Sequence, residues 1–178
     1  MLLLLRISVL LLGTLGFANL PAQDTSAILP TVGHDSIASP TATTATPDTL
    51  RTFVNYDSAK DYAEAHDLDI LMVYAGSDWC RPCKLFKRTI LSDDGFKHAA
   101  GESVVLLYLD FPAKRSNKLP RAQQDHNDAL AERYNPSGVF PKILLFDTAG
   151  EEIGELVFEG QDPTTFAAQL AAARIARG

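Results

Sequence analysis

Two cysteines three positions apart are the only thiols in this chain of 178 residues. They are Cys80 and Cys83, which flank an Arg-Pro dipeptide. Cysteines at this spacing at the start of a helix lie close enough to form a disulfide with each other. Unpaired backbone N–H groups and the positive end of the helix dipole favour a thiolate there. We therefore predict a redox-active pair in which Cys80 faces solvent and attacks a substrate, and Cys83 resolves the mixed disulfide.

Three neighbours of the cysteines bear on how readily the thiolate forms. Arg81 adds a fixed positive charge near Cys80, which favours the thiolate and makes the disulfide more oxidising. Lys84 acts in the same direction if its ammonium group can approach Cys80. Pro82 suits the first helical turn, because it removes an N–H group that would have no partner inside the helix.

Other uses of a cysteine pair fit the sequence less well. A structural disulfide would close a loop too small to restrict the unfolded chain much. A structural zinc site needs four ligands, but there is no second cysteine pair and the histidines are scattered. Covalent haem attachment would need a histidine after Cys83, where Lys84 stands. We predict no metal, and no cofactor besides the Cys80–Cys83 disulfide itself. The scattered histidines are His34, His66, His98 and His126.

The first 22 residues have the pattern of a secretory signal peptide. Residues 1–12 are almost purely Leu, Ile and Val apart from Arg6, and residues 13–22 are small and mixed. The apolar run is shorter than the about 20 residues that span a membrane. We expect cleavage after Ala18 or Ala22, with an uncleaved membrane anchor as the alternative. Export would place the domain in the periplasm or outside the cell, without stable membrane insertion after cleavage.

Residues 23–49 are rich in Thr, Ala, Ser and Pro and lack aromatic side chains. Such a segment buries too little apolar surface to fold, so we expect a flexible linker or an unselected extension. The folded domain then covers residues 50–178. The formal net charge of −6 disfavours nucleic acid as a partner, because binding to phosphates depends on clustered Lys and Arg.

Apolar runs and helical patterns alternate after residue 50. Two continuous apolar runs are typical of strands buried on both faces, and a turn-rich connection between two later strands is typical of an antiparallel hairpin. Asp57 or Ser58 can cap the first helix, and Asp162 followed by Pro163 can begin the last. The order α-β-α-β-α-β-β-α predicts a mixed sheet flanked by helices. The expected strands are 70–75, 104–109, 142–146 and 153–158, and the expected helices are 59–65, 85–91, 121–134 and 164–177.

The segment from Tyr74 to Lys84 resembles the active-site strand, turn and helix of the thioredoxin superfamily. Its Gly-Ser-Asp-Trp-Cys sequence is similar to that of exported bacterial thioredoxin-like proteins. The resemblance extends from about Leu50 to the C-terminus. It includes residues 139–146, where the family places a cis-proline before a strand, and Gly160, at the family's glycine after the last strand. It implies an α/β thioredoxin fold, with a mixed central sheet flanked by helices.

The resemblance also implies roles for three further residues. Pro141 is expected to be cis and packed against the disulfide. Phe140 would present its backbone to an extended substrate segment, as in strand addition. Trp79 would cover Cys80 and offer an aromatic contact surface. Ordinary core packing is the alternative for Trp79 and Phe140.

The sequence departs from the thioredoxin pattern at two places. Tyr74 stands where thioredoxins carry a buried Asp that assists proton transfer at the inner cysteine, and a tyrosine titrates too high to be an easy base. Asp78 would either replace that carboxylate through a water molecule or simply cap the turn. The loop 111–120 is longer and more basic than thioredoxins require. It is either a solvated loop or a partner-selecting surface near the active site.

These features together predict a thiol–disulfide oxidoreductase that reduces or rearranges disulfides of exported proteins and is kept reduced by a membrane electron donor. Because of Arg81, its redox potential is expected to lie above that of cytosolic thioredoxin, and an oxidising role stays open. The alternative is a non-catalytic binding or chaperone module with a thioredoxin fold.

Overall fold

The computed structural model describes residues 49–176, which form an α/β domain. The expected signal peptide (1–22) and all but the last residue of the expected linker (23–49) lie outside these residues, so both stay predictions. In the described range, no helix is both long enough and apolar enough to cross a membrane.

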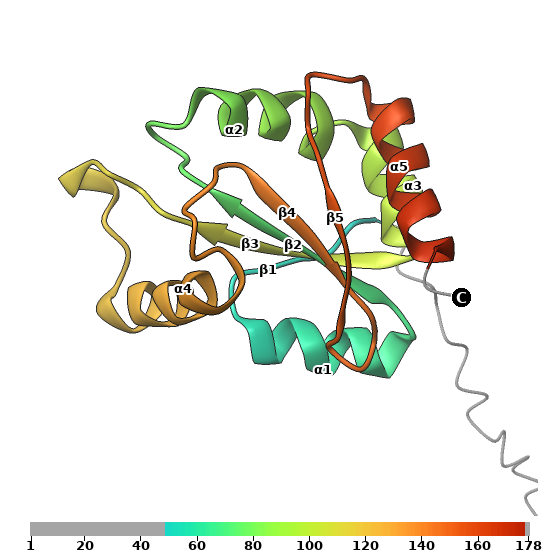
Figure 1. Cartoon of the computed structure of the whole chain (residues 1–178), viewed down its shortest axis with the longest axis horizontal. Helices are drawn as coiled ribbons and strands as arrows, with labels where there is room; N and C mark the ends of the chain where they lie inside the picture. Colours follow the sequence, from blue (N-terminus) through green and yellow to red (C-terminus); the bar gives the residue numbers. More distant parts are fainter. Residues whose placement is uncertain (1–48, 177–178) are drawn as a thin grey trace, which may run out of the picture. The chain divides into compact units, whose positions relative to one another are not determined.

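Within residues 49–176, five strands form one sheet in the order β1-β3-β2-β4-β5 (Figure 1). β1 and β2 run parallel to β3, whereas β4 is antiparallel to both β2 and β5. The predicted mixed sheet and the predicted C-terminal hairpin are therefore confirmed. β5 ends two residues earlier than predicted, where its pairing with β4 stops. The strands are β1 (Thr52–Phe53), β2 (Asp69–Ala75), β3 (Val104–Asp110), β4 (Lys142–Phe146) and β5 (Glu152–Leu156).

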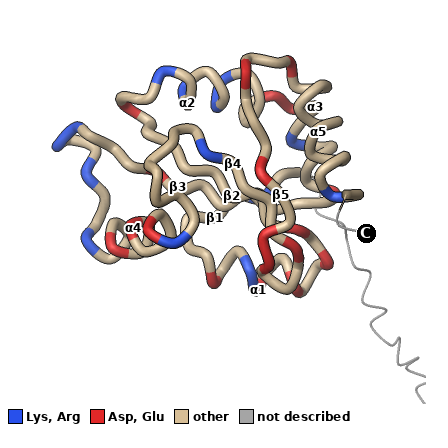
Figure 2. Tube along the Cα trace, viewed as in Figure 1, with Lys and Arg blue, Asp and Glu red and all other residues tan. Residues whose placement is uncertain are grey.

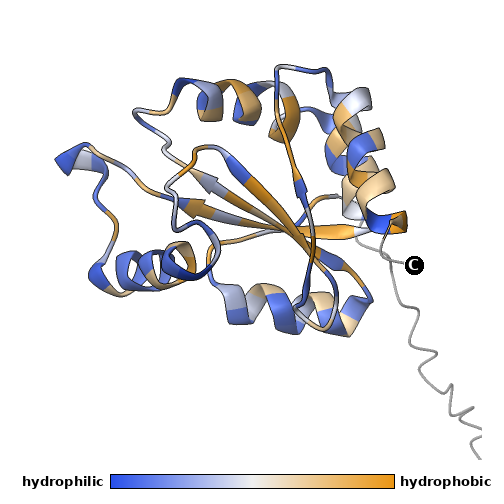
Figure 3. Cartoon of the chain, in the orientation of Figure 1, coloured by the Kyte–Doolittle hydropathy of each residue, from blue (hydrophilic) through white to orange (hydrophobic). Residues whose placement is uncertain are grey.

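Helices cover both faces of this sheet (Figure 1). One face packs against α1 and α4, and the other packs against α2, α3 and α5. Figure 3 shows the most hydrophobic segments in the strands between these two layers. A π-helical segment continues α2, and a 3₁₀ turn precedes α4. The helical segments are α1 (Tyr56–His66), α2 (Arg81–Phe86), the π segment (Lys87–Leu91), α3 (Asp94–Gly101), the 3₁₀ turn (Arg115–Asn117), α4 (Arg121–Tyr134) and α5 (Pro163–Ile175).

β2 is the strand that positions the redox segment. All of its residues are buried, and it lies between β3 and β4. Its side chains alternate between the two faces: Val73 and Ala75 join the core cluster that contains both cysteines, and Met72 and Tyr74 join the opposite cluster. β2 therefore has a neighbouring strand at each edge and packed side chains on each face, and the short turn to α2 begins at its end.

The start of α1 differs from the sequence prediction. Asn55 caps the helix, because its Oδ1 accepts the N–H of Ser58 at 2.9 Å. The prediction that Asp57 or Ser58 would be the cap was wrong, since the helix already begins at Tyr56. The local pattern contained two adjacent polar candidates and nothing that identified the true first turn.

The sequence patterns also missed β1 and α3. β1 has two residues, too few to show any alternation, and is defined by its pairing with β3. α3 follows Asp93, whose Oδ1 accepts the N–H of Phe96 at 2.8 Å. Gly101 at the end of α3 lies against the backbone of Thr49 and Leu50, where a Cβ atom would come within 2.5 Å. This close approach places the start of the domain against α3, where the N–H of Leu50 donates to the backbone oxygen of Lys97 at 2.9 Å.

A buried ion pair joins the start of β2 to the last helix. The predicted start of α5 is confirmed, since Asp162 accepts N–H bonds from the first turn and Pro163 is the first helical residue. Near the other end of α5, Nε of Arg174 donates to Oδ2 of Asp69 at 2.6 Å. Asp69 is 1% exposed and the Arg174 side chain is 27% exposed, so the carboxylate end of this contact lies in the core.

We expect Arg174→Met to destabilise the domain by about 2 kcal/mol, because the buried Asp69 would lose this charge-assisted hydrogen bond. Urea unfolding followed by circular dichroism measures the change. Lys60→Met is the matched control, because Lys60 pairs with Glu64 on the surface, where such pairs contribute little. Equal losses in the two variants would contradict the prediction.

Candidate active site

Cys80 and Cys83 form a disulfide at the start of α2. Their Cα atoms are 5.3 Å apart, within the ordinary range for protein disulfides. Cys80 caps the helix, and the N–H of Cys83 donates to the Cys80 Sγ at 3.2 Å. Pro82 lies in the first turn, as predicted. When the pair is reduced, the Cys83 N–H and the positive end of the helix dipole favour a thiolate on Cys80.

Both cysteines are buried in the disulfide form. Cys80 is 4% exposed and Cys83 is 2% exposed, so the expected contrast between a solvent-facing and a covered residue is small. The exposed residue of this turn is Trp79, at 49%. The side chain of this turn that solvent reaches is therefore the indole of Trp79, next to Cys80 in the chain.

Three contacts hold the side chain of Trp79. Its Nε1 donates to the backbone oxygen of Phe111 at 2.7 Å. Its ring lies edge-on to Phe140, with the ring centroids 5.2 Å apart. The indole also lies over Gly76, where a Cβ atom would come within 2.3 Å of the ring. Gly76 is therefore needed at this position because any side chain would displace the indole.

The Phe140–Pro141 peptide bond is cis, as expected from the family resemblance. The packing of Pro141 against the disulfide stays a prediction. The Phe140 ring packs against both core clusters and lies 5.4 Å from the Phe111 ring, so the core-packing alternative describes its side chain. Among the described residues, nothing hydrogen-bonds to its backbone N–H or C=O. The ring of Phe140 therefore packs in the core, while its backbone N–H and C=O lack a hydrogen-bond partner among these residues.

Asp78 fastens the basic loop 111–120 to the redox turn. Its Oδ1 accepts the N–H of Ala113 at 2.9 Å, and its Oδ2 accepts the N–H of Lys114 at 2.9 Å and Nδ2 of Asn117 at 3.0 Å. These bonds, that of Ala113 above all, hold the pKa of the Asp78 carboxyl below its ordinary value of 3.8.

Neither of the two roles expected for Asp78 describes these contacts. Its partners lie 35 to 39 positions away along the chain, so it does not simply cap its own turn. The lowered pKa of its carboxyl also argues against a proton relay near neutral pH. The loop is thereby placed beside the active-site turn, and its role as a solvated loop or a partner-selecting surface stays open.

The two cations next to the cysteines differ in their contacts. Nζ of Lys84 donates to the backbone oxygen of Asp78 at 3.3 Å, so its ammonium group lies at the redox turn. Arg81 is exposed and has no carboxylate partner within residues 49–176. Their influence on the Cys80 thiolate stays a prediction.

Tyr74 lies away from the cysteines, on the opposite face of β2. Its hydroxyl donates to the backbone oxygen of Leu130 in α4 at 3.0 Å. Burial, above all, raises the pKa of Tyr74 far above its ordinary value. The expectation that Tyr74 does not act as an easy base is therefore confirmed, and its hydroxyl instead ties β2 to α4.

A hydrogen-bond network that sequence reasoning missed joins the redox turn to α4 and α1. The N–H and Oγ of Ser77 donate to the carboxylate of Asp110, at 2.8 and 2.6 Å. The buried Asn127 donates to the backbone oxygen of Asp110 at 2.9 Å, and its Oδ1 lies 3.0 Å from Nδ1 of His126. The N–H of Tyr56 donates to the other ring nitrogen of His126 at 3.0 Å. The sequence signal for this network was Asp110, an acid directly after the expected buried strand 104–109.

Within residues 49–176, no three His, Cys, Asp or Glu side chains gather closely enough to hold a metal ion. The disulfide at the start of α2 and the rings of Trp79 and Phe140 lie together in this part of the domain.

We expect Asp78→Ala to release the loop, so that the amides of Ala113 and Lys114 exchange with solvent about tenfold faster. Hydrogen exchange followed by NMR measures this. Asp94→Ala is the matched control, because Asp94 is also an exposed carboxylate with a lowered pKa but bonds only to Lys97. Unchanged exchange in Asp78→Ala would contradict the anchoring role.

The protection of the same amides should depend on pH with a definite sign. Because the folded pKa of Asp78 is the lower one, its contribution is complete well above pH 3.8 and is lost as the pH falls through the lowered value. The wild-type loop should therefore lose protection only in this acidic range. A loss near neutral pH would show that another group holds the loop.

Comparison with known proteins agrees with this geometry. A family model for a thioredoxin-like domain matches residues 56–174. The disulfide bond reductase DsbH of Chlamydia pneumoniae is 31% identical over 105 residues, which are 59% of this chain and 61% of that protein. The chain thus spans less than two thirds of the length of this relative.

Solved structures show the same fold. A DsbH oxidoreductase superposes with a TM-score of 0.64 at 24% identity, covering 80% of this chain and 94% of its own. A thioredoxin from Thermus thermophilus superposes with a TM-score of 0.54 at 23% identity, covering 73% of this chain and 91% of its own. The family match contains the redox turn and strands β2 to β5, so this chain belongs to the thioredoxin-like domain family.

Proposed function

We propose that this protein is a thiol–disulfide oxidoreductase that acts through Cys80 and Cys83 on disulfides of exported proteins, as a reductant or isomerase. The observation that carries the proposal is the disulfide at the start of α2, with the Cys83 N–H directed at the Cys80 Sγ. The similarity to a protein named as a disulfide bond reductase supports the reducing direction.

The reducing reaction has two exchange steps. The Cys80 thiolate attacks one sulfur of the substrate disulfide, which forms a mixed disulfide between Cys80 and that sulfur, breaks the substrate S–S bond and releases the other sulfur as a thiolate. Cys83 then loses its proton and attacks the Cys80 sulfur, which releases the second substrate thiolate. Two electrons have passed from the dithiol to the substrate, and the released thiolates take up protons. The helix start stabilises the Cys80 thiolate whenever it attacks or leaves.

Trp79, Phe140 and Pro141 form the surface that would receive the substrate segment. The edge-on packing of Trp79 on Phe140 holds the two rings in place beside the redox turn. The N–H and C=O of Phe140 have no partner among the described residues, so an extended substrate segment can bond to them as an added strand. Aromatic side chains add contact area to such backbone recognition.

Export and electron supply complete the proposal. The signal-peptide pattern of residues 1–22 supports action in the periplasm or outside the cell. Each reduced substrate leaves the Cys80–Cys83 pair oxidised, so a reductant needs a renewed supply of electrons. A membrane protein that carries electrons across from the cell interior is the donor class that suits an exported domain.

We expect Cys83→Ser to accumulate mixed disulfides between Cys80 and exported proteins, because the resolving thiol is gone. Non-reducing electrophoresis followed by mass spectrometry identifies the trapped species. The wild-type protein should also accelerate the reduction of insulin by dithiothreitol, and Cys80→Ser should do neither.

A non-catalytic binding or chaperone module would behave differently. Its variant with both Cys80→Ser and Cys83→Ser would retain the same partners as the wild-type protein, and insulin would be reduced at the uncatalysed rate. That pair of results would contradict the proposed enzymatic function.

Arg81 should make the disulfide more oxidising. We expect a redox potential less negative than about −270 mV, the value typical of thioredoxin, because the guanidinium favours the Cys80 thiolate. Arg81→Gln should shift the potential by about 10–20 mV toward that value, since exposed charges act weakly. Equilibration with glutathione measures both, and Arg133→Gln in α4 is the matched control. An unchanged potential in Arg81→Gln would remove this role.

A further inference from the structure

The basic side chains of residues 49–176 differ in their partners. Five pair with carboxylates: Lys60 with Glu64, Lys97 with Asp94, Arg121 with Asp125, Lys142 with Glu155 and Arg174 with Asp69. Three more lie over aromatic rings: Arg51 on Tyr62, Lys87 on Tyr108 and Arg133 on Tyr134. The other six are exposed and make neither kind of contact within residues 49–176, and we call them the basic rim: Arg81, Lys84, Arg88, Lys114, Arg115 and Lys118.

The basic rim lies on both sides of the redox turn. Three of its members come from α2 and the π segment that continues it, and three come from the loop 111–120. The carboxylate of Asp78 holds this loop at the turn, two positions before Cys80. Figure 2 shows the basic segments of α2 and of the loop, and acidic segments along β5, α1 and α4.

The charge of the rim is opposite to that of the protein. The whole chain carries a formal charge of −6, so the rim is a local positive patch on an otherwise acidic protein, and such a patch attracts anionic partners. Three acids lie beside the rim cations. The carboxylate of Asp78 is occupied by three donors, that of Asp110 accepts two bonds from Ser77, and Asp128 lines the cavity beside the loop. Within residues 49–176 none of the three makes an ion pair with a rim cation, so the cations remain available to an anionic partner that approaches the disulfide.

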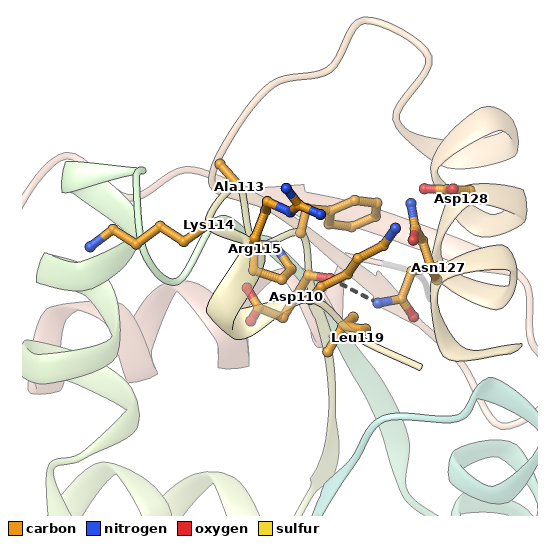
Figure 4. A pocket seen from close by; sticks show the side chains of 11 residues that line it. Asp110, Ala113, Lys114, Arg115, Leu119, Asn127 and Asp128 are labelled. Carbon is orange, nitrogen blue, oxygen red and sulfur yellow. Dashed lines mark hydrogen bonds between the residues drawn. The ribbon is translucent and has the colours of Figure 1, made fainter. Parts of the chain in front are cut away.

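A cavity of about 330 Å³ adjoins the rim between the loop and α4. Phe111 and Leu119 give it apolar walls, and the three basic residues of the loop also line it. Figure 4 shows Arg115 and Leu119 on the loop side, opposite Asn127 on α4. The volume suits one side chain of a bound polypeptide rather than a flat membrane surface.

We propose that the basic rim is a docking surface for an acidic polypeptide segment that carries the substrate disulfide. This inference rests on the proposed function and adds a substrate class to it: disulfides flanked by Asp or Glu. Carboxylates of the segment pair with the rim, and an apolar neighbour enters the cavity. Such charge matching acts chiefly on the rate of encounter and on the choice of partner.

The test uses three synthetic peptides with the same internal disulfide, flanked by glutamates, by serines or by lysines. The wild-type protein is first reduced, and its rate of exchange with each peptide is divided by that peptide's rate with dithiothreitol, which removes differences in intrinsic reactivity. At low salt we expect the glutamate peptide to react at least about tenfold faster than the lysine peptide. At about 1 M salt, where charges are screened within about 3 Å, the ratio should approach one.

Two triple variants distinguish an effect of the rim cations from an effect of the protein's net charge. The variant K114Q/R115Q/K118Q should lose most of the preference for the glutamate peptide, although the backbone bonds of the loop to Asp78 are kept. The matched control K60Q/K97Q/R133Q removes the same charge elsewhere and should retain the preference. Equal loss in both variants would show a general charge effect and overturn the inference.

The remaining outcomes are distinct. If the reduced protein reacts with none of the peptides, the proposed function itself fails. If it reacts with all three at equal normalised rates, the function stands and the docking inference is overturned. Sedimentation with vesicles of anionic phosphatidylglycerol is the last arm. Binding of vesicles that depends on the rim, together with equal peptide rates, would assign this surface to a membrane instead.

Discussion

The burial of β2 on both faces is the constraint on which the site depends. Neighbouring strands enclose it laterally, and helices cover its two faces. A shift of its register by one residue would exchange every side chain between the two faces. One face of β2 therefore packs in the cluster that contains the cysteines and residues of α3 and α5. Tyr74 lies on the other face, toward α4, where its hydroxyl has a backbone partner. The redox turn inherits its direction from this alternation.

The turn that follows β2 is held by bonds to distant segments. Ser77 bonds to Asp110 at the end of β3, and Asp78 bonds to the loop beyond it. Trp79 bonds to the backbone of Phe111, in the same connection. Three successive residues thus secure one connection from β3 to α4 before the chain reaches Cys80. The site is a joint property of two segments about thirty positions apart.

Sequence reasoning succeeded where the deciding interactions are local. The buried strands, the hairpin, the Pro82 position and the Cys80–Cys83 pair all follow from neighbours a few residues away. The cis bond before Pro141 came from the family resemblance, because spacing alone predicts no isomer. The anchoring role of Asp78, the Ser77–Asp110 bonds and the pairing of β1 depend on partners far along the chain. No local pattern specifies such partners, so these features were missed.

The position of Trp79 has an optical consequence. It is the only tryptophan in the chain, and it directly precedes Cys80. Its indole packs on Phe140 and Gly76, so its surroundings are those of the redox turn itself. Light absorbed and emitted by this one ring comes from the place where sulfur bonds form and break. The protein therefore contains a built-in spectroscopic reporter of its own oxidation state, and no label has to be attached to follow it.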